Sequence, residues 1–180
     1  MKSDRLTLKP ISEKDVDHVM TWVNNPSVIG NIATLSGEDF TREQELSYIR
    51  RMQESPDDEV FSIWDGDRYI GQTGVHQIYQ RSRIGRLAIV IATNQEMGKG
   101  YGSEAIRRLL DYAFSPAGMN LHKVWLLVFE GNTRSIRTYK RIGFVEEGVL
   151  REEYYHEGVY HNMVRMSILA QEWGCTNTSG

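Results

Sequence analysis

The sequence predicts a mixed α/β fold, in which a mostly antiparallel sheet contains one central parallel crossover and carries helices on both faces. Short segments with alternating or continuous apolar residues recur between Leu6 and Leu169, and most follow one another through short turns, as antiparallel neighbours do. One pair encloses a long amphipathic segment, from Tyr101 to Phe114. Strand, helix and strand in that order make a right-handed parallel connection, so we expect the two flanking strands to lie side by side.

The length and composition of the chain suit one domain with a sizeable core. It has 180 residues, of which 40% are hydrophobic and 25% are charged, values that are ordinary for a globular protein. No internal repeat, low-complexity segment or linker divides it. We therefore predict a single domain over residues 1–180, with a core over about 4–170 and a polar C-terminal tail over 171–180.

Charge and hydropathy argue against several other classes of protein. The net charge is −3 and no run of Lys or Arg is present, which disfavours nucleic-acid binding. No apolar segment approaches the roughly 20 residues of a membrane span, and the polar start has no signal-peptide core. The single cysteine, Cys175, has no partner for an internal disulfide. We predict a cytoplasmic protein with neither nucleic-acid nor membrane partners.

Local signals place the elements of the first half of the chain. Ser12 and Asp15 mark the start of a first helix, and Thr41 and Gln44 have the spacing of a capping box that starts a second. The predicted elements are a strand over residues 6–8, a helix over 12–23, a loop over 26–40, a helix over 41–52, and strands over 60–64 and 69–76.

The second half contains the predicted crossover and a final hairpin. Its elements are a strand over residues 83–91, a helix over 101–114, a strand over 123–129, a helix over 133–142, and strands over 144–150 and 160–169. Residues 123–129 are apolar without interruption, which is typical of a strand that is buried on both faces. Gly143 follows its helix as a left-handed cap, and the hairpin turn lies near Gly158.

A glycine-rich loop joins the first crossover strand to its helix. Gly98, Gly100 and Gly102 alternate there, so the backbone can approach a ligand closely and present its N–H groups. The helix that follows adds unpaired first-turn donors and the positive end of its dipole. Together these features indicate an anion site, most naturally for phosphate. The plainer alternative is a tight turn without a ligand.

The spacing of the glycines excludes two common phosphate-binding loops. A P-loop needs Ser or Thr after its lysine, whereas Lys99 precedes Gly100. A dinucleotide-binding fingerprint needs Gly-x-Gly-x-x-Gly, and here the third glycine comes one residue early.

Two motifs together resemble the signatures of the GCN5-related N-acetyltransferase (GNAT) family. The first is Gln95-x-x-Gly98-x-Gly100 in the glycine loop. The second runs from Asn132 to Phe144 and has a serine three residues after the asparagine, a helical tyrosine and a closing Gly-Phe. The resemblance covers essentially the whole chain. It is strongest to the branch of ribosomal-protein N-terminal and spermidine acetyltransferases, whose last hairpin is similar to residues 148–165.

The resemblance implies direct transfer of an acetyl group from acetyl-CoA to a primary amine through a ternary complex. The acceptor would be a protein N-terminus, a polyamine or another small amine. Family analogy also places the donor. Strand backbone would pair with the pantetheine at Ile89, Val90 and Ile91, the loop would hold the pyrophosphate at Met97, Gly98, Lys99, Gly100, Tyr101, Gly102 and Ser103, and the thiol end would be lined by Asn132, Ser135, Tyr139 and Arg141.

Acetyl transfer needs an acid for the departing thiolate. A phenol of pKa about 10 can donate to a thiolate whose conjugate acid has a pKa near 8.5. Tyr139 matches the family position for this acid. Periodicity alone gives a plainer interpretation, in which Tyr139 packs beside Ile136 on the buried side of its helix.

The transfer also needs a base, because an alkyl amine of pKa about 10.4 is neutral in only about one molecule in 2,500 at pH 7. Many relatives carry a Glu in the strand before the glycine loop, but the nearest position here is Arg86 and its same-face neighbour is Ala88. No residue is therefore assigned to the role. Candidate substitutes, each with a plainer structural interpretation, are Glu130, His76, Glu38 and Asp39.

Acceptor specificity in this fold should come from the loop over residues 26–40 and from the last hairpin. The hairpin combines three carboxylates with aromatic residues, which could attract a cationic amine: Glu152, Glu153, Tyr154, Tyr155, His156 and Glu157. An exposed charged hairpin is the plainer interpretation. His122, His156 and His161 lack metal-ligand spacing, so we interpret them as structural and predict no metal.

Two classes of function stay open at this point. The first is the acetyl-CoA-dependent N-acetyltransferase, with acetyl-CoA and an amine acceptor as partners and a homodimer as an open alternative. The second is a sensor or interaction module that binds acyl-CoA without turnover, because the family Glu is absent.

Overall fold

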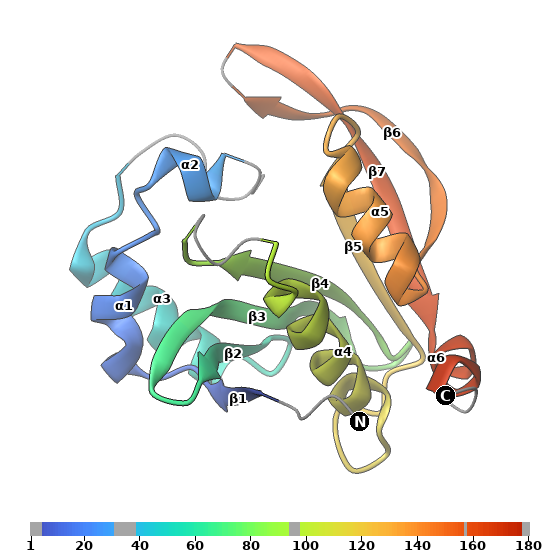
Figure 1. Cartoon of the computed structure of the whole chain (residues 1–180), viewed down its shortest axis with the longest axis horizontal. Coiled ribbons are helices and arrows are strands. Elements are labelled where there is room, and N and C mark those ends of the chain that lie inside the picture. Colours follow the sequence, from blue (N-terminus) through green and yellow to red (C-terminus); the bar gives the residue numbers. More distant parts are fainter. Residues whose placement is uncertain (1–4, 31–38, 94–97, 157, 178–180) are drawn as a thin grey trace.

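The computed structural model is organised around one seven-stranded sheet in the order β1-β2-β3-β4-β5-β7-β6 (Figure 1). It describes residues 5–30, 39–93, 98–156 and 158–177. For residues 175–177 it describes the backbone alone. The strands are β1 (Leu6–Pro10), β2 (Glu59–Asp65), β3 (Arg68–Tyr79), β4 (Ile84–Ile91), β5 (Lys123–Phe129), β6 (Val145–His156) and β7 (Val159–Leu169). β6 and β7 extend closer to the turn between them than the predicted strands over 144–150 and 160–169.

The predicted helices appear in the expected order. One further short helix begins the predicted loop over residues 26–40, and another follows residue 169. The helices are the 3₁₀ turn η1 (Glu13–Asp15), α1 (Val16–Met20), α2 (Pro26–Ile29), α3 (Arg42–Glu54), α4 (Tyr101–Phe114), α5 (Thr133–Ile142) and α6 (Ala170–Asn177). The predicted bounds of α4, α5 and β5 are confirmed to the residue. The predicted capping box of α3 is also confirmed, since Thr41 and Gln44 exchange side-chain hydrogen bonds of 3.2 and 2.7 Å.

The parallel crossover is confirmed, and it is unusually short. β4 and β5 pair in parallel at three positions only, Ile84 with Lys123, Gly85 with Val124 and Arg86 with Trp125. Every other strand pair is antiparallel. β5 instead pairs along its whole length with β7, so beyond Trp125 it follows the final hairpin and diverges from β4 (Figure 1).

Helices cover both faces of the sheet, as predicted. On one face α4 contributes Ile106 and Leu109 to a core that also contains Leu87 of β4. On the opposite face α1 and α3 pack through Val16 and Ile49 against β2. Apolar residues that alternate along the strands supply both layers, because neighbouring side chains on a strand point to opposite faces.

The predicted first helix over residues 12–23 is shorter than expected. Its first turn is the 3₁₀ turn η1, and α1 ends at Met20. The carboxylate of Asp15 accepts a hydrogen bond of 2.9 Å from the Ser12 N–H and another of 2.9 Å from the Ser62 hydroxyl of β2. The sheet thus anchors this turn, an effect that the local pattern does not contain.

The predicted loop over residues 26–40 begins with a short helix. The Asn25 side chain caps α2 by accepting a hydrogen bond of 3.1 Å from the Ser27 N–H, and Pro26 occupies the first helical position. Asn25 and Pro26 therefore start a helix inside the predicted loop. Residues 31–38 of the predicted loop, including Glu38, lie outside the described residues.

The core extends beyond residue 170, which corrects the predicted polar tail over 171–180. Residues 170–177 form α6, and Trp173 on this helix is only 5% exposed. Its indole Nε1 donates a hydrogen bond of 2.8 Å to the Asp111 carboxylate of α4. A single apolar ring within polar sequence is a weak local signal, which explains the wrong boundary. The assignment of residues 1–180 to a single domain stays a prediction.

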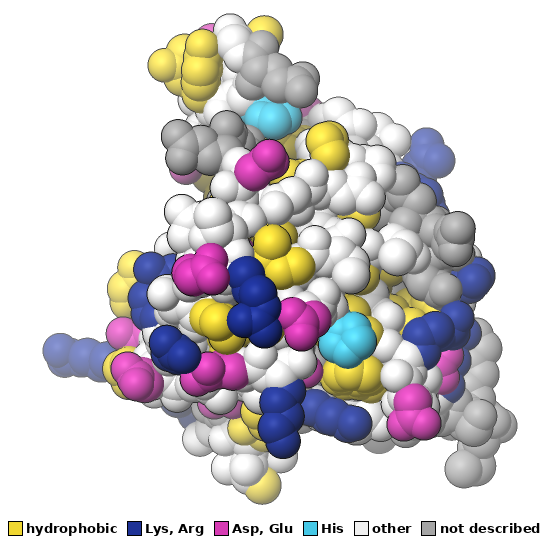
Figure 2. Space-filling view, turned by 90° about the vertical axis from the view of Figure 1, so that its left-hand side faces the viewer, with side chains coloured by type: hydrophobic (Ala, Val, Ile, Leu, Met, Phe, Trp, Pro, Cys, Tyr) yellow, Lys and Arg dark blue, Asp and Glu magenta, His cyan; other side chains and the backbone are white. Residues whose placement is uncertain are grey.

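The surface carries charges of both signs. Figure 2 shows the face with α1 and α3, where basic and acidic side chains are interspersed. Two of the ion pairs there join Arg42 to Asp17 and Arg50 to Glu13. None of the helices in the described ranges has the length and apolar character needed to cross a membrane. A cytoplasmic location stays a prediction.

Replacing Trp173 by Ala should lower the free energy of unfolding by about 3–5 kcal/mol, because it leaves a large cavity against α4. Urea unfolding measures the change. Gln171→Ala, an exposed substitution on the same helix, serves as the control and should change stability by less than about 0.5 kcal/mol. A loss below about 1 kcal/mol for Trp173→Ala would show that α6 is not part of the core.

Candidate functional site

The glycine loop has the backbone conformation of an anion site. Gly98 and Gly100 have φ angles of +85° and +88°, in the left-handed region that residues with a Cβ rarely adopt. Gly100 is also the N-cap of α4, so no side chain caps the first turn of this helix. The N–H groups of that turn are therefore available to a phosphate. Met97 lies outside the described residues.

The side chain of Tyr101 belongs to the structure of the loop rather than to its open face. The residue is 4% exposed, and its hydroxyl donates a hydrogen bond of 2.6 Å to the Asp65 carboxylate of β2. Only its backbone can face a ligand. Gly102 and Ser103 are half-buried, and Lys99 is exposed.

Two arginines that sequence reasoning missed lie against this loop. The guanidinium of Arg134, at the start of α5, is 3.3 Å from where a Cβ on Gly98 would be. Arg5 donates a hydrogen bond of 2.7 Å to the Lys99 carbonyl and forms an ion pair of 2.8 Å with Glu104. Arg5 is thus held by protein groups. Arg134 adds positive charge where a phosphate would meet the loop.

The end of β4 offers a free backbone edge towards β5. Ile89, Val90 and Ile91 pair with β3 on one side. On the other side the pairing with β5 ends at Arg86, so the last residues of β4 have no strand partner there within the described ranges. This is the arrangement that an extended ligand such as a pantetheine arm needs, because it can pair with the exposed peptide groups.

The start of α5 lies at the same end of the sheet. The Asn132 side chain caps α5 by accepting a hydrogen bond of 3.1 Å from the N–H of Ser135. Arg141 lies in the last turn of the same helix, exposed, with its guanidinium 3.3 Å from the Thr138 hydroxyl. A helix of this length separates its ends by about 15 Å, so the structure does not bring Arg141 beside Asn132.

Tyr139 is half-buried on the face of α5 that packs against the core. Its ring lies 5.8 Å from the ring of Phe144, and its surroundings include Ile136. This is the packing that the periodicity predicts, and the role of Tyr139 as the acid stays a prediction. Burial raises the pKa of the Tyr139 phenol to about 12. No hydrogen bond to its hydroxyl is found among the described residues, so the phenol O–H can donate to a ligand.

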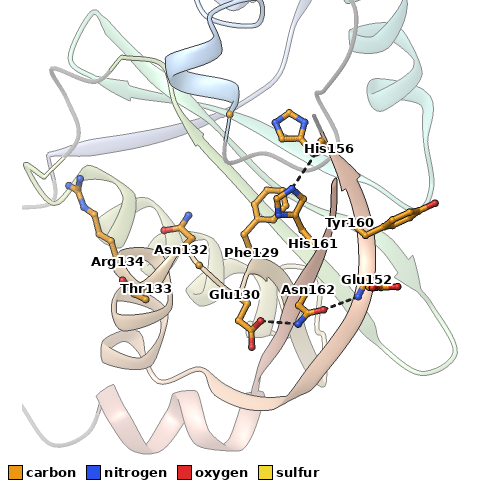
Figure 3. Close-up of a pocket in the computed structure, with 12 residues that line it drawn as sticks. Phe129, Glu130, Asn132, Thr133, Arg134, Glu152, His156, Tyr160, His161 and Asn162 are labelled. Carbon is orange, nitrogen blue, oxygen red and sulfur yellow. Dashed lines mark hydrogen bonds between the residues drawn. The ribbon is translucent and has the colours of Figure 1, made fainter. Parts of the chain in front are cut away.

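A cavity of about 770 Å³ lies at the end of β5, between the start of α5 and the β6–β7 hairpin (Figure 3). Gly30, at the end of α2, also borders it. The first two segments contribute Phe129, Glu130, Asn132 and Arg134, and the hairpin contributes Glu152, His156, Tyr160, His161 and Asn162. The regions predicted to select the acceptor, the loop after the first helix and the last hairpin, thus both reach this cavity.

A hydrogen-bonded chain fixes one rim of the cavity. The Asn162 amide donates a hydrogen bond of 2.9 Å to the Glu130 carboxylate and accepts one of 2.9 Å from the N–H of Glu152 (Figure 3). Glu152 has a φ angle of +53° at the point where the register between β6 and β7 shifts. Asn162 therefore holds both the irregular strand and the carboxylate of Glu130.

Aromatic and imidazole rings form another wall. The ring of Phe129 lies 5.6 Å from that of Tyr154 and 5.5 Å from that of His161. His161 Nε2 is 3.3 Å from the carbonyl oxygen of His156 (Figure 3). Nothing in the sequence indicates this placement, and the interpretation of His156 and His161 as structural stays a prediction. Only the pairing of β7 with β5, a contact between distant segments, brings His161 to the end of β5.

Of the predicted substitutes for the family Glu, only Glu130 is described in the cavity wall. His76 instead bonds Asp58 at 2.8 Å, and burial lowers the pKa of its imidazole. Asp39 is exposed. Arg86 is half-buried near Asp58, and burial lowers the pKa of its guanidinium. The position of the family Glu therefore supplies no base.

Comparison with known proteins decides between the two classes of function. The family model described as "Acetyltransferase (GNAT) domain" matches residues 5–145 of this chain. The chain belongs to the GNAT acetyltransferase family. It is 30% identical to a spermidine N(1)-acetyltransferase of Vibrio cholerae over 95% of this chain and 96% of that protein. It is 29% identical to a putative ribosomal N-acetyltransferase of Bacillus subtilis, over 95% of this chain and 94% of that protein.

Solved structures agree with this assignment. The structure of spermidine N-acetyltransferase from Vibrio cholerae in complex with CoA and spermine matches with a TM-score of 0.87 and 27% identity, over 95% of this chain and 99% of that one. The predicted fold and activity are confirmed: this GNAT protein is an acetyl-CoA-dependent N-acetyltransferase, and acetyl-CoA is its acetyl donor. The alternative of a module without turnover is therefore set aside.

Replacing Arg134 by Gln should weaken the binding of CoA about tenfold, because a charge-assisted contact to phosphate is lost. Calorimetry with CoA measures the affinity. The difference in affinity between the variant and the unmodified protein should become smaller at high salt. Lys140→Gln removes the same charge from the far end of α5, where Lys140 pairs with Glu146 at 2.9 Å, and should bind CoA like the unmodified protein. An Arg134 variant with unchanged affinity would exclude Arg134 from the donor site.

Proposed function

We propose that this GNAT enzyme acetylates a small amine that carries more than one positive charge, a polyamine-type acceptor, in the cavity beside the β6–β7 hairpin. The observation that carries the proposal is the composition of the cavity wall, where the carboxylates of Glu130 and Glu152 stand beside the rings of Phe129 and Tyr160. Carboxylates and aromatic faces both attract ammonium groups. The spermine complex of the Vibrio cholerae relative supports the same class of acceptor.

The donor would approach from the glycine loop. Its pyrophosphate would bind the backbone of residues 98–103, with Arg134 adding a positive charge. Its pantetheine arm would pair with the free edge of Ile89–Ile91, and the thiol end would reach the start of α5 near Asn132 and Ser135. Arg134 would thus stand where the donor loop meets the cavity, with the carboxylates of Glu130 and Glu152 elsewhere in the same wall.

Tyr139 would donate the proton that the departing CoA thiolate requires. With a pKa of about 12, its phenol stays protonated across the neutral range and into the alkaline range. The raised pKa makes the buried phenol a weaker acid, but the same burial would also raise the pKa of the CoA thiol formed beside it. The two groups therefore stay matched closely enough for a hydrogen bond that strengthens as the C–S bond breaks.

Replacing Tyr139 by Phe should lower kcat about a hundredfold, the usual contribution of a positioned acid, and leave the affinity for CoA within about twofold. Thiol release measured with a chromogenic disulfide gives kcat, and calorimetry gives the affinity. Since the phenol titrates near pH 12, the unmodified enzyme should show no loss of activity from this group below about pH 11. Unchanged turnover in the variant would remove Tyr139 from the mechanism.

An amine panel tests the acceptor class. Spermidine and spermine should give higher kcat/KM than peptides with a free N-terminus or amino sugars. Glu130→Gln and Glu152→Gln should each raise the KM for spermine about fivefold, because a cation then lacks one carboxylate partner. Glu153→Gln, an exposed substitution outside the cavity wall, is the matched control. A clear preference for peptide N-termini would refute the polyamine proposal.

The quaternary structure is a separate part of the proposal. A homodimer stays a prediction, which the molar mass in solution would test.

A further inference from the structure

Every amine acetyltransferase needs a group that takes a proton from its acceptor, and here the family position holds Arg86. Within the described part of the cavity wall, the groups that can accept a proton are Glu130, Glu152, His156 and His161. Glu130 directly follows β5, and His161 lies beside the end of that strand, since the N–H of Glu130 bonds the carbonyl of Asn162, the residue after His161, at 3.1 Å.

The side chains of His161 and Tyr139 lie on opposite faces of the sheet. Val128 belongs to the core beneath α4 and α5, and Tyr139 packs against the same core. Phe129 is the next residue along β5, so its side chain points to the opposite face. The His161 ring lies 5.5 Å from the Phe129 ring on that face. The imidazole and the phenol therefore flank the end of β5 from opposite sides.

The surroundings of His161 select one tautomer. Its Nε2 lies 3.3 Å from the carbonyl oxygen of His156, and a carbonyl oxygen can only accept a hydrogen bond. The contact is a hydrogen bond when Nε2 carries the hydrogen. In the neutral ring the lone pair is then on Nδ1, which leaves this nitrogen able to accept a proton.

We propose that His161 is the general base of this enzyme, with Nδ1 accepting the proton of the acceptor amine and the His156 carbonyl fixing the tautomer. The proposal rests on the proposed function, because it takes the cavity as the acceptor site. A base on the face opposite Tyr139 receives the proton on the amine side while the acid serves the sulfur side. In direct transfer the base acts on the amine and the acid on the departing sulfur.

The other groups of the wall fit the role less well. The Glu130 carboxylate is already engaged by a hydrogen bond of 2.9 Å from the Asn162 amide. It is also exposed, in the turn that follows β5. Glu152 is exposed at the irregular part of β6. His156 is the last residue of β6, next to the hairpin turn and farther from the end of β5.

The protons and bonds balance as follows. The acceptor arrives as an ammonium ion, and its first proton passes to His161 Nδ1 and then to water. The neutral nitrogen attacks the thioester carbon, and the C–S bond breaks as the C–N bond is completed. The thiolate takes the Tyr139 proton, and the second proton lost by the nitrogen restores the phenol. The products are the acetylated amine, CoA and one proton in solution.

The test compares two substitutions of His161 with the best acceptor found in the amine panel. In His161→Gln the side-chain amide can still donate to the His156 carbonyl, but it cannot accept a proton at neutral pH. We expect kcat to fall about a hundredfold, with the KM for acetyl-CoA within about twofold. His122→Gln, at the exposed start of β5 and outside the cavity, is the control and should keep full activity.

His161→Ala adds a test of chemical rescue, which a purely structural role of His161 would not produce. Added imidazole should restore kcat at least tenfold, and a series of substituted imidazoles should rescue better as their basicity increases. Binding of CoA, measured by calorimetry, reports that both variants are folded. Rescue that tracks basicity supports proton transfer rather than the refilling of a cavity.

The outcomes separate this proposal from the proposed function. A His161→Gln variant that keeps more than about half of kcat, or a His161→Ala variant without rescue, overturns the role of His161 while polyamine acetylation stands. If the unmodified enzyme prefers another class of amine, the polyamine proposal fails, and the same two variants still test the base with that amine.

Discussion

The short parallel pairing of β4 and β5 determines the site. After Arg86 and Trp125 the two strands separate, and β5 keeps only its pairing with β7, which runs along its whole length. A backbone N–H without a partner costs about 1–3 kcal/mol when it is shielded from water, so the separated edge must bind water or a ligand. The glycine loop follows one strand and α5 follows the other. The separation therefore brings both family motifs to one end of the sheet.

Features fixed by neighbouring residues could be predicted from the sequence. α4 begins after a glycine, α5 lies between the Asn132 cap and Gly143, and β5 is an uninterrupted apolar run, so their bounds were correct. Features that depend on distant segments could not be predicted. Asp15 is drawn to Ser62, Trp173 packs beside Asp111, and Arg134 reaches Gly98 only because the sheet brings these segments together.

The same distinction explains which residues of the candidate site could be recognised from the sequence. Tyr139 lies inside a local motif, so resemblance alone could single it out. His161 has no motif around it, and its place depends on the register between β5 and β7 and on the irregular pairing of β6. The Asn162 bonds to Glu130 and Glu152 stabilise that irregular pairing. A polar residue in a hairpin therefore acquires its position from three strands at once.

Arg86 shows why the position of the family Glu supplies no base in this chain. The residue pairs in register with Trp125, four residues before Phe129, so its backbone lies about 13 Å along the strands from the end of β5. Its guanidinium interacts with Asp58 and is half-buried. The carboxylates that line the cavity, Glu130 and Glu152, come instead from the turn after β5 and from the hairpin. The acidic groups near the end of β5 therefore come from segments that follow it in the sequence, not from β4.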